Sequence, residues 1–377
     1  MNVKNCINID DLRNAARRRA HKMVFDYIDG GADDEKTLAR NTSAFDDYEL
    51  YYKVLSGVDN PDTSTTLLGE KIDVPFFLSP SAGNRLFHTV GEIGPAVAAD
   101  KVGTIYSLAT LSSISIEEIG ALTKSPKWFQ LYVWKDRVLV KEMLDRAKAA
   151  GFTALFLTVD LPIAGNRERD PKNGFTVPPK IGPKQMWEGL KAPWWVMDYL
   201  FSSPITYANL DNATSAVTLN KFIQDQMDAS FNWDDAEWLL GEWNGPAILK
   251  GVVRPDDAVR AERSGFNAIS ISNHGGRQLD TSPAPISCLA PIRDTVSDKT
   301  ELILDGGIRR GTDVLKALAM GANAVSFARP YLYGLAAGGE EGAIRAVELI
   351  RDSIIRDMIL LGAGSIKDID ESFIKTK

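Results

Sequence analysis

The stretch AERSGFNAISIS, residues 261–272, passes from the end of a helix through a glycine turn into a short apolar strand. The same pattern returns in AKAAGFTALFLT (147–158) and LAMGANAVSF (318–327), and more faintly in AADKVGTIYS (98–107). Each glycine suits the left-handed residue that ends a helix. Each apolar run is short and nearly continuous, as in parallel strands that are buried on both faces. The chain therefore repeats a helix–strand unit.

Counting such strands along the chain yields eight, with helices between them. This order favours an α/β fold of the (β/α)8 TIM barrel type with an N-terminal helical extension. A doubly wound open sheet is less favoured, because no strand leads into a G-x-G-x-x-G dinucleotide turn. The last helix is expected at about Glu341–Leu361, ending at Gly362. The expected strands are approximately Val74–Leu78, Thr104–Leu108, Trp128–Tyr132, Ala154–Thr158, Ala247–Lys250, Ala268–Ser272, Glu301–Leu304 and Ala324–Phe327.

The composition is that of an ordinary globular protein, with 44% hydrophobic and 25% charged residues. We expect one domain over residues 1–377, because α/β barrels form large single units. A net charge of -7 argues against a nucleic-acid partner. Cys6 and Cys288 cannot make a disulfide framework, which favours a reducing compartment. The N-terminus does not resemble a signal peptide and no apolar run could span a bilayer, so a cytoplasmic location is expected.

His274 follows the expected sixth strand, in the stretch SNHGGRQLD (272–280). A titratable base, a guanidinium three residues later on Arg277, and two glycines between them can hold a small anion and move a proton. A lone histidine is more often a hydrogen-bonded structural residue. The arginine and glycines beside it favour a functional role for this one.

Polar residues replace the apolar pattern at one end of the expected barrel. In such barrels the chemistry gathers at the C-terminal ends of the strands. Any one of these residues could be a cap or a surface residue, but together they predict a site, with no metal expected in it. In strand order they are Ser79, Ser81 and Ala82; Gln130 and Tyr132; Thr158, Asp160 and Arg167; Lys250; Ser272, His274 and Arg277; Asp305, Gly306, Gly307 and Arg309; and Ala328 and Arg329.

The loops after strands seven and eight predict a bound phosphate, which barrels often hold at this position. Gly306 and Gly307 let backbone N–H groups approach an anion closely. Arg309 and Arg329 can each offer a planar fork to phosphate oxygens. Lys250, at an inward strand end, could neutralise negative charge on a reduced cofactor ring, although a snorkelling surface lysine is the alternative.

The whole chain resembles the FMN-dependent L-2-hydroxy acid oxidases and dehydrogenases, a family that includes glycolate oxidase, mandelate dehydrogenase and respiratory L-lactate dehydrogenase. SNHGGRQLD (272–280) is similar to the family's most specific signature. Five further motifs match in the expected order: YIDGGA (27–32), FQLYV (129–133), TVD (158–160), LKG (249–251) and LDGGIRRG (304–311).

The resemblance implies roles for individual residues. His274 would take the substrate proton, with Asp160 orienting its imidazole. The carboxylate would be clamped by Arg167 and Arg277, and a bidentate arginine pair fixes orientation as well as charge. Tyr27 and Tyr132 would hydrogen-bond the substrate, and Lys250 would stabilise reduced FMN. The residues implied to contact FMN are Ser81, Ala82, Gln130, Thr158, Lys250, Ser272, Asp305, Gly307, Arg309, Ala328 and Arg329.

The chain departs from the family pattern at two places. Ala328 precedes Arg329 where the family usually has glycine, which narrows the backbone approach to phosphate. Leu111 and Ala164 stand where glycolate oxidase carries a tryptophan and a leucine. Smaller side chains at these two positions favour a roomier substrate pocket and weaken an assignment to glycolate.

The connection from about 175 to 231, after strand four, is far longer than an ordinary loop. Its aromatic run, Pro193–Phe201, is atypical of a disordered linker. Tryptophan and tyrosine favour the bilayer interface, which supports a peripheral membrane contact on the inner membrane face. An active-site lid or a subunit interface remains open, and the resemblance implies a homotetramer.

Three functions remain open from the sequence. The first is a dehydrogenase that oxidises a lactate- or mandelate-like L-2-hydroxy acid and passes electrons to a quinone or other carrier. The second is an oxidase of the same class that reduces O2 to H2O2. The third is a binding barrel without activity, which would need a broken constellation, and every expected catalytic residue is present. Another FMN barrel, such as an isomerase, is disfavoured by paired arginines around a base.

Overall fold

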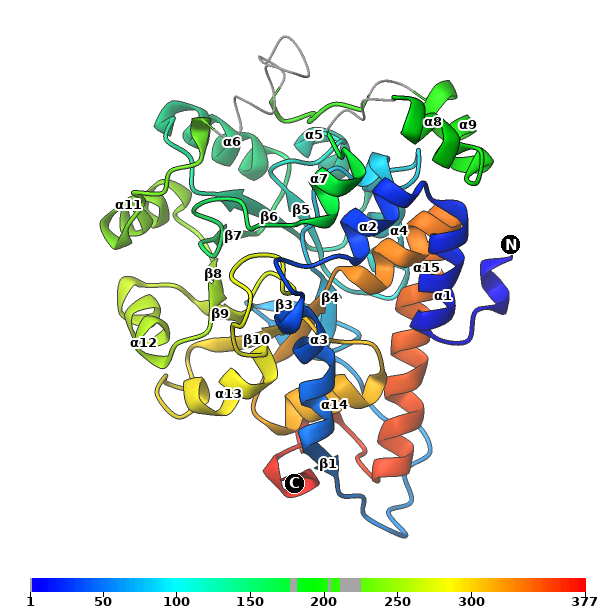
Figure 1. Cartoon of the computed structure of the whole chain (residues 1–377). Coiled ribbons are helices and arrows are strands. Elements are labelled where there is room, and N and C mark those ends of the chain that lie inside the picture. Colours follow the sequence, from blue (N-terminus) through cyan, green and yellow to red (C-terminus); the bar gives the residue numbers. More distant parts are fainter. Residues whose placement is uncertain (1, 177–181, 203–204, 211–224) are drawn as a thin grey trace.

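Eight parallel strands close into a barrel surrounded by helices (Figure 1), as the repeat predicts. The computed structural model describes residues 2–176, 182–202, 205–210 and 225–377. Around the barrel the strand order is β10-β11-β4-β5-β6-β7-β8-β9, so the chain passes once around the ring. The barrel strands are β4 (Phe76–Leu78), β5 (Tyr106–Ala109), β6 (Lys127–Tyr132), β7 (Ala154–Thr158), β8 (Ala247–Val252), β9 (Ala268–Ile271), β10 (Glu301–Asp305) and β11 (Ala324–Phe327).

The first two barrel strands begin two residues later than the sequence predicts. β4 begins at Phe76 rather than Val74, because Pro75 has no N–H to donate to a neighbouring strand. β5 begins at Tyr106 rather than Thr104, whose N–H donates instead to the carbonyl of Ala99 at 3.0 Å. Both differences are at the N-terminal ends of the strands, whereas the expected site is at their C-terminal ends.

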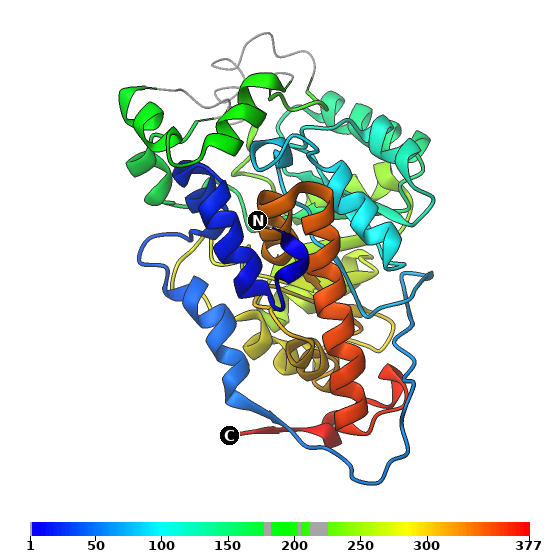
Figure 2. The ribbon, with the colours of Figure 1, turned by 90° about the vertical axis from the view of Figure 1, so that its right-hand side faces the viewer.

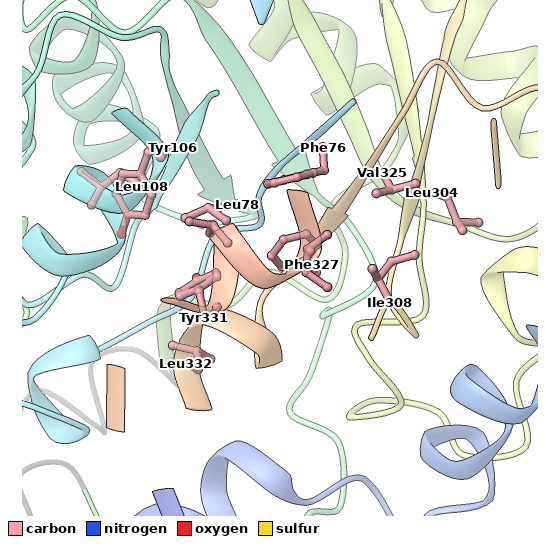
Figure 3. Close-up of a cluster of buried hydrophobic side chains, with 14 of the residues drawn as sticks. Phe76, Leu78, Tyr106, Leu108, Leu304, Ile308, Val325, Phe327, Tyr331 and Leu332 are labelled. Atoms are coloured by element: carbon pink, nitrogen blue, oxygen red, sulfur yellow. The ribbon is translucent and has the colours of Figure 1, made fainter. Parts of the chain in front are cut away.

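Side chains along each strand alternate between two apolar layers. Phe77 belongs to the cluster inside the barrel, whereas Phe76 and Leu78 face the surrounding helices. Figure 3 shows part of this outer layer, where Phe327 and Tyr331 lie near Leu78. An unpredicted hairpin of β2 (Thr65–Leu67) and β3 (Glu70–Ile72) adds Leu67 and Ile72 to the inner cluster. The N–H of Leu68 donates to Glu301 at the start of β10, so the hairpin covers the N-terminal end of the barrel.

Helices fill the spaces between the strands. The glycine turns of the repeat, at residues 103, 151, 265 and 321, all have positive φ, as predicted. The last helix begins at Arg329, earlier than expected, with a non-helical kink at Gly338 and Gly339, and it ends at Gly362 as predicted. The larger helices are α4 (Ile93–Lys101), α5 (Ile116–Leu122), α6 (Arg137–Ala149), α11 (Trp233–Trp243), α12 (Pro255–Ser264), α13 (Pro285–Arg293), α14 (Gly311–Ala319) and α15 (Arg329–Leu361).

The expected N-terminal extension is helical, and α1 lies along α15 (Figure 2). Its helices are α1 (Ile9–Arg19), α2 (Lys22–Asp29) and α3 (Lys36–Ser43). The C-terminal strand β12 (Ile374–Thr376) pairs antiparallel with β1 (Tyr48–Leu50), which follows the N-terminal helices. The described residues also include the short 3-10 helices η1 (Val3–Asn5), η2 (Ala44–Asp47), η3 (Asn84–Leu86), η4 (Ile366–Asp368) and η5 (Glu371–Phe373).

The long connection after β7 carries α7 (Arg169–Asn173), α8 (Pro183–Gly189) and α9 (Pro193–Phe201). α9 contacts α1, so the pair α8–α9 lies beside the N-terminal extension (Figure 1). Parts of the expected 175–231 insertion, namely 177–181, 203–204 and 211–224, lie outside the described residues. In the part of the chain that the structure describes, every helix is too short or too polar to cross a membrane.

Candidate active site

A cavity of about 280 Å³ opens at the C-terminal end of the barrel. Of the predicted site residues, only Asp160 and Ser272 do not line it, and both contact residues that do, His274 and Lys250 respectively. A larger cavity, about 810 Å³, lies outside the barrel near α1 and α15. The predicted residues that line the smaller cavity are Tyr27, Ser79, Ser81, Ala82, Gln130, Tyr132, Thr158, Arg167, Lys250, His274, Arg277, Asp305, Gly306, Gly307, Arg309, Ala328 and Arg329.

His274 is held on the cavity wall by contacts on two sides. Its Nδ1 atom lies 2.8 Å from Oδ1 of Asp160, and its backbone N–H donates to Oγ of Ser272 at 3.0 Å. Its φ of 57° is in the left-handed region, which is uncommon for a non-glycine residue. Burial lowers the pKa of His274 although Asp160 opposes the shift. The imidazole is therefore neutral at pH 7, and a proton on Nδ1 shared with Asp160 leaves Nε2 as the acceptor.

Two guanidinium groups face the same part of the cavity. Arg277 lies over the ring of Tyr27, with its guanidinium carbon 4.7 Å from the ring centroid. Arg167 donates to the carbonyl of Arg277 at 3.3 Å and to the side chain of Gln278 at 3.2 Å. The pKa of Arg277 is lowered mainly by burial and, to a smaller extent, by the positive charge of Arg167. Within the described ranges neither guanidinium forms an ion pair with a carboxylate, so the two together favour a bound anion.

The floor of the cavity is a buried charged network. Nζ of Lys250 forms an ion pair with Asp305 and lies 2.9 Å from Oγ of Ser272. Asp305 also accepts hydrogen bonds from Ser272 at 2.8 Å and Ser326 at 2.7 Å. Burial opposes ionisation of Asp305, but Lys250 and the hydroxyl donors outweigh it and hold its pKa at about 2. The network therefore places a fixed ammonium–carboxylate pair directly beneath the cavity.

The side chains of Gln130 and Thr158 lie on the same floor. Nε2 of Gln130 donates to Oγ1 of Thr158 at 3.1 Å, and Oε1 of Gln130 accepts the N–H of Thr110 at 3.2 Å. Both residues are buried. Gln130 lies within β6, and Thr158 is the last residue of the adjacent strand β7. They can offer an amide and a hydroxyl to a planar polar ring.

The phosphate-binding features predicted from the last two loops lie together at one side of the cavity. Gly307 has a φ of 83°, and a Cβ atom there would lie 2.1 Å from the carbonyl oxygen of Asn41. Arg309 donates to its neighbour's carbonyl, and Arg329 donates to three backbone carbonyls. Burial lowers the pKa of Arg329. Two arginines beside a loop that only glycine can form, close to a lysine, provide donors that fit the phosphate and ring of FMN.

Tyr207 was not predicted, yet it lines the cavity and is almost fully buried. It comes from the long insertion, which Asn209 ties to the loop after β5 through Ser112 at 2.9 Å and the N–H of Ile116 at 2.9 Å. Burial raises the pKa of Tyr207, as it does that of Tyr132, so both hydroxyls stay protonated. No local pattern in the sequence marks Tyr207, because its place depends on contacts with a segment almost a hundred residues away.

The chain is similar to known proteins over most of its length. Residues 16–376 match the family model of FMN-dependent dehydrogenases. An L-lactate oxidase from Nostoc sp. is 39% identical over 99% of both chains. A protein named putative L-lactate dehydrogenase from Mycobacterium tuberculosis is 38% identical over 96% of this chain and 87% of its own length. The solved structure of the monotopic membrane protein (S)-mandelate dehydrogenase superposes with a TM-score of 0.95, at 33% identity over 99% of this chain and 100% of that one.

The barrel and the match to this family identify the chain as a flavin-dependent oxidoreductase of 2-hydroxy acids. The chain belongs to the FMN-dependent dehydrogenase family, whose members include lactate, glycolate and mandelate enzymes. FMN is therefore its cofactor.

Proposed function

We propose that this enzyme oxidises a lactate- or mandelate-like L-2-hydroxy acid to the 2-oxo acid, with His274 as the base. One observation carries the proposal. A neutral imidazole, oriented by Asp160 at 2.8 Å, lies in the same cavity as two guanidiniums that have no carboxylate partner among the described residues. This arrangement can bind a carboxylate and remove a proton next to it.

Each residue has a separate task in this mechanism. Arg277 and Arg167 bind the substrate carboxylate and so orient the C2 carbon. His274 accepts one substrate proton at Nε2, and Asp160 stabilises the imidazolium that results. The hydroxyls of Tyr27 and Tyr132 hydrogen-bond the substrate. FMN, when bound, accepts the two electrons of the oxidation.

The remaining predicted residues are proposed to hold the cofactor. Lys250, on the cavity floor, would offset negative charge that develops on the reduced ring. Gln130, Thr158 and Ser272 would contact the ring and ribityl groups. The phosphate end would lie against Arg309 and Arg329, with further contacts from Ser81, Ala82, Asp305, Gly307 and Ala328.

The side-chain end of the cavity supports a substrate larger than glycolate. Leu111 and Ala164 both line the cavity, as their sequence positions predict. With Leu161 and Tyr207 they form a mainly apolar wall that could accept a methyl or phenyl group. A substrate panel of glycolate, L-lactate, L-mandelate and longer acids, followed by anaerobic flavin reduction, tests this proposal. Fastest reduction by glycolate would contradict it.

For the electron acceptor we propose a quinone or another carrier, with O2 as the alternative. Relatives of similar identity are named as dehydrogenases and as oxidases, so either acceptor is compatible with the family. The deciding measurement compares reoxidation of the substrate-reduced enzyme by a short-chain quinone with reoxidation by air. Fast reoxidation by air with stoichiometric H2O2 would assign the enzyme as an oxidase.

A peripheral membrane contact, on the inner face of the cytoplasmic membrane, is supported by the surface of α8 and α9. Its apolar side chains are largely exposed, and the adjoining cavity of about 810 Å³ contains the basic residues Lys4, Arg18 and Arg19. Lys4 belongs to η1 and the two arginines to α1, so the basic side chains come from the N-terminal extension rather than from the insertion itself. Arg19 pairs with Asp198 of α9. The exposed apolar residues of this α8–α9 surface are Met186, Trp187, Leu190, Trp194, Met197, Leu200 and Phe201.

A homotetramer is also proposed, from the family resemblance.

A further inference from the structure

The C-terminal end of α2 supports both halves of the active site. The carbonyls of Tyr27 and Gly30 accept hydrogen bonds from Arg277, the latter at 3.2 Å. The carbonyls of Ile28 and Gly30 accept hydrogen bonds from Arg329, at 3.0 and 2.9 Å. Three carbonyls within four residues thus hold one arginine proposed to bind the substrate carboxylate and one proposed to bind the cofactor phosphate.

The same helix end fits closely against the loop that carries the base. The N–H of Ala32 donates to the carbonyl of Gly276 at 2.9 Å. A Cβ atom on Gly31 would lie 2.8 Å from that carbonyl oxygen, closer than real Cβ contacts come. The position of the α2 end is therefore tightly constrained where it meets the loop from His274 to Arg277.

Asp29 is the last residue of α2, and its carboxylate is buried with 6% exposure. A negative charge is unfavourable at this end of a helix, and burial of a charge is costly unless it is paired. The carboxylate is paired with groups from three other elements. Arg13 of α1 binds both oxygens, at 2.5 and 2.9 Å, Arg169 of α7 lies at 3.3 Å, and the hydroxyl of Tyr333 of α15 donates at 2.9 Å.

These contacts keep the carboxylate ionised. Burial opposes ionisation of Asp29, but hydrogen bonds from Arg13 and Tyr333 outweigh it and lower its pKa. Asp29 also adds a favourable negative charge near Arg329. Asp29 itself does not line the cavity, so it acts on bound ligands without touching them, through the helix end that it anchors and through its charge near Arg329.

We propose that Asp29 is a positioning residue that ties the end of α2 to α1, α7 and α15, so that one buried carboxylate sets both the substrate-carboxylate site and the cofactor-phosphate site. This inference rests on the proposed roles of Arg277 and Arg329. It gives a function to the one charged residue of the YIDGGA motif, for which the proposed mechanism has no task.

The test is Asp29→Asn, which removes the charge and keeps the shape. Three dissociation constants are measured on the full-length protein: FMN and riboflavin by flavin fluorescence on the apoprotein, and oxalate by its perturbation of the bound-flavin spectrum. We expect FMN and oxalate each to bind roughly tenfold more weakly, a change of about 1.4 kcal/mol. Riboflavin has no phosphate for Arg329 to bind, so its affinity should hardly change. KM for the substrate should rise more than kcat falls.

Asp26→Asn is the matched control. Asp26 lies on the same helix and near Arg169, at 3.7 Å, and it accepts from Asn173 at 2.7 Å, but it contacts neither Arg13 nor Tyr333. We expect its three affinities to match wild type. If Asp29→Asn cannot be purified folded, Tyr333→Phe removes one donor to the same carboxylate and should weaken FMN and oxalate together by a smaller factor.

Three outcomes overturn the inference. In the first, FMN and oxalate bind the variant as they bind wild type. In the second, the variant binds only one of these two ligands more weakly than wild type does. In the third, binding of riboflavin weakens as much as binding of FMN, which would mean a general loosening of the fold. A wild-type protein that binds neither FMN nor oxalate would instead refute the proposed function itself.

Discussion

Nδ1 of His274 lies 2.8 Å from Oδ1 of Asp160, although the two residues follow strands that are not neighbours in the barrel. Asp160 follows β7 and His274 follows β9, so the contact crosses the end of β8. Gly251 of β8 makes this possible, because a Cβ atom there would lie 2.6 Å from Cβ of Asp160. A residue with no side chain is thus needed between the base and the carboxylate that orients it.

The first prediction concerns His274→Gln, which keeps polarity and approximate size. The variant should fold and retain FMN, because its backbone contact with Ser272 does not involve the ring. Anaerobic flavin reduction by the 2-hydroxy acid should slow by roughly 10²–10⁴-fold, the usual worth of a general base. Reduction at a near-normal rate in a stopped-flow experiment would remove His274 from that role.

The second prediction is the pH dependence of kcat/KM, which reports the free enzyme. The base works only when neutral, and burial lowers its pKa from the ordinary value of 6.5. Activity should therefore stay level as pH falls through 6.5 and decline only at lower pH, where His274 becomes protonated. Asp160 raises this pKa, so Asp160→Asn should move the acid limb to still lower pH while also reducing the rate. An acid limb above pH 6.5 in wild type would contradict the assignment.

The third prediction concerns the carboxylate clamp. Arg277→Met or Arg167→Met removes one partner of a desolvated charge pair, which costs about 2–5 kcal/mol. Both kcat/KM for the acid and the affinity for oxalate should fall accordingly. Turnover of the neutral 2-hydroxy amide provides the control, since the amide carries no carboxylate. Wild-type enzyme that turned over the amide as well as the acid would rule out a clamp.

The fourth prediction separates two adjacent tryptophans of α9. Trp194 is 71% exposed, whereas Trp195 is buried and donates to the carbonyl of Leu86 at 2.8 Å, next to Phe87 of the cavity wall. Trp194→Ser with Phe201→Ser should reduce co-sedimentation with lipid vesicles or change the oligomer mass, and leave flavin reduction intact. Trp195→Ser should instead affect reduction through the Leu86 loop. If the double variant of Trp194 and Phe201 slows flavin reduction and changes neither vesicle co-sedimentation nor oligomer mass, α9 is a lid.

Trp194 and Trp195 differ in exposure in a way that the aromatic pattern of Pro193–Phe201 does not predict. The pattern of aromatic residues indicates contact with something, but not which side of α9 faces the protein. Trp195 stacks on Tyr199 within α9 and donates to the carbonyl of Leu86. The contact with Leu86 places Trp195 inward, and it exists only when the insertion is folded against the loop after β4.

The sequence was sufficient for the features that depend on local order along the chain. The helix–glycine–strand pattern is local and occurs four times, and eight buried strands separated by helices have few compact arrangements. The barrel and its C-terminal site could therefore be predicted. The location of the motif residues could also be predicted, because the end of a strand places its side chains at a known edge of the barrel. The extent of one domain over 1–377 and the individual site roles stay predictions.

Tertiary structure alone decided the features that depend on distant contacts. It placed Tyr207 in the cavity through Asn209, and it covered the N-terminal end of the barrel with a hairpin that carries no strong local signal. It also joined Asp29 to Arg13, Arg169 and Tyr333, whose positions span more than three hundred residues. A sequence pattern indicates which side chains of a segment can be buried. The segment against which they pack is determined only when the whole chain folds.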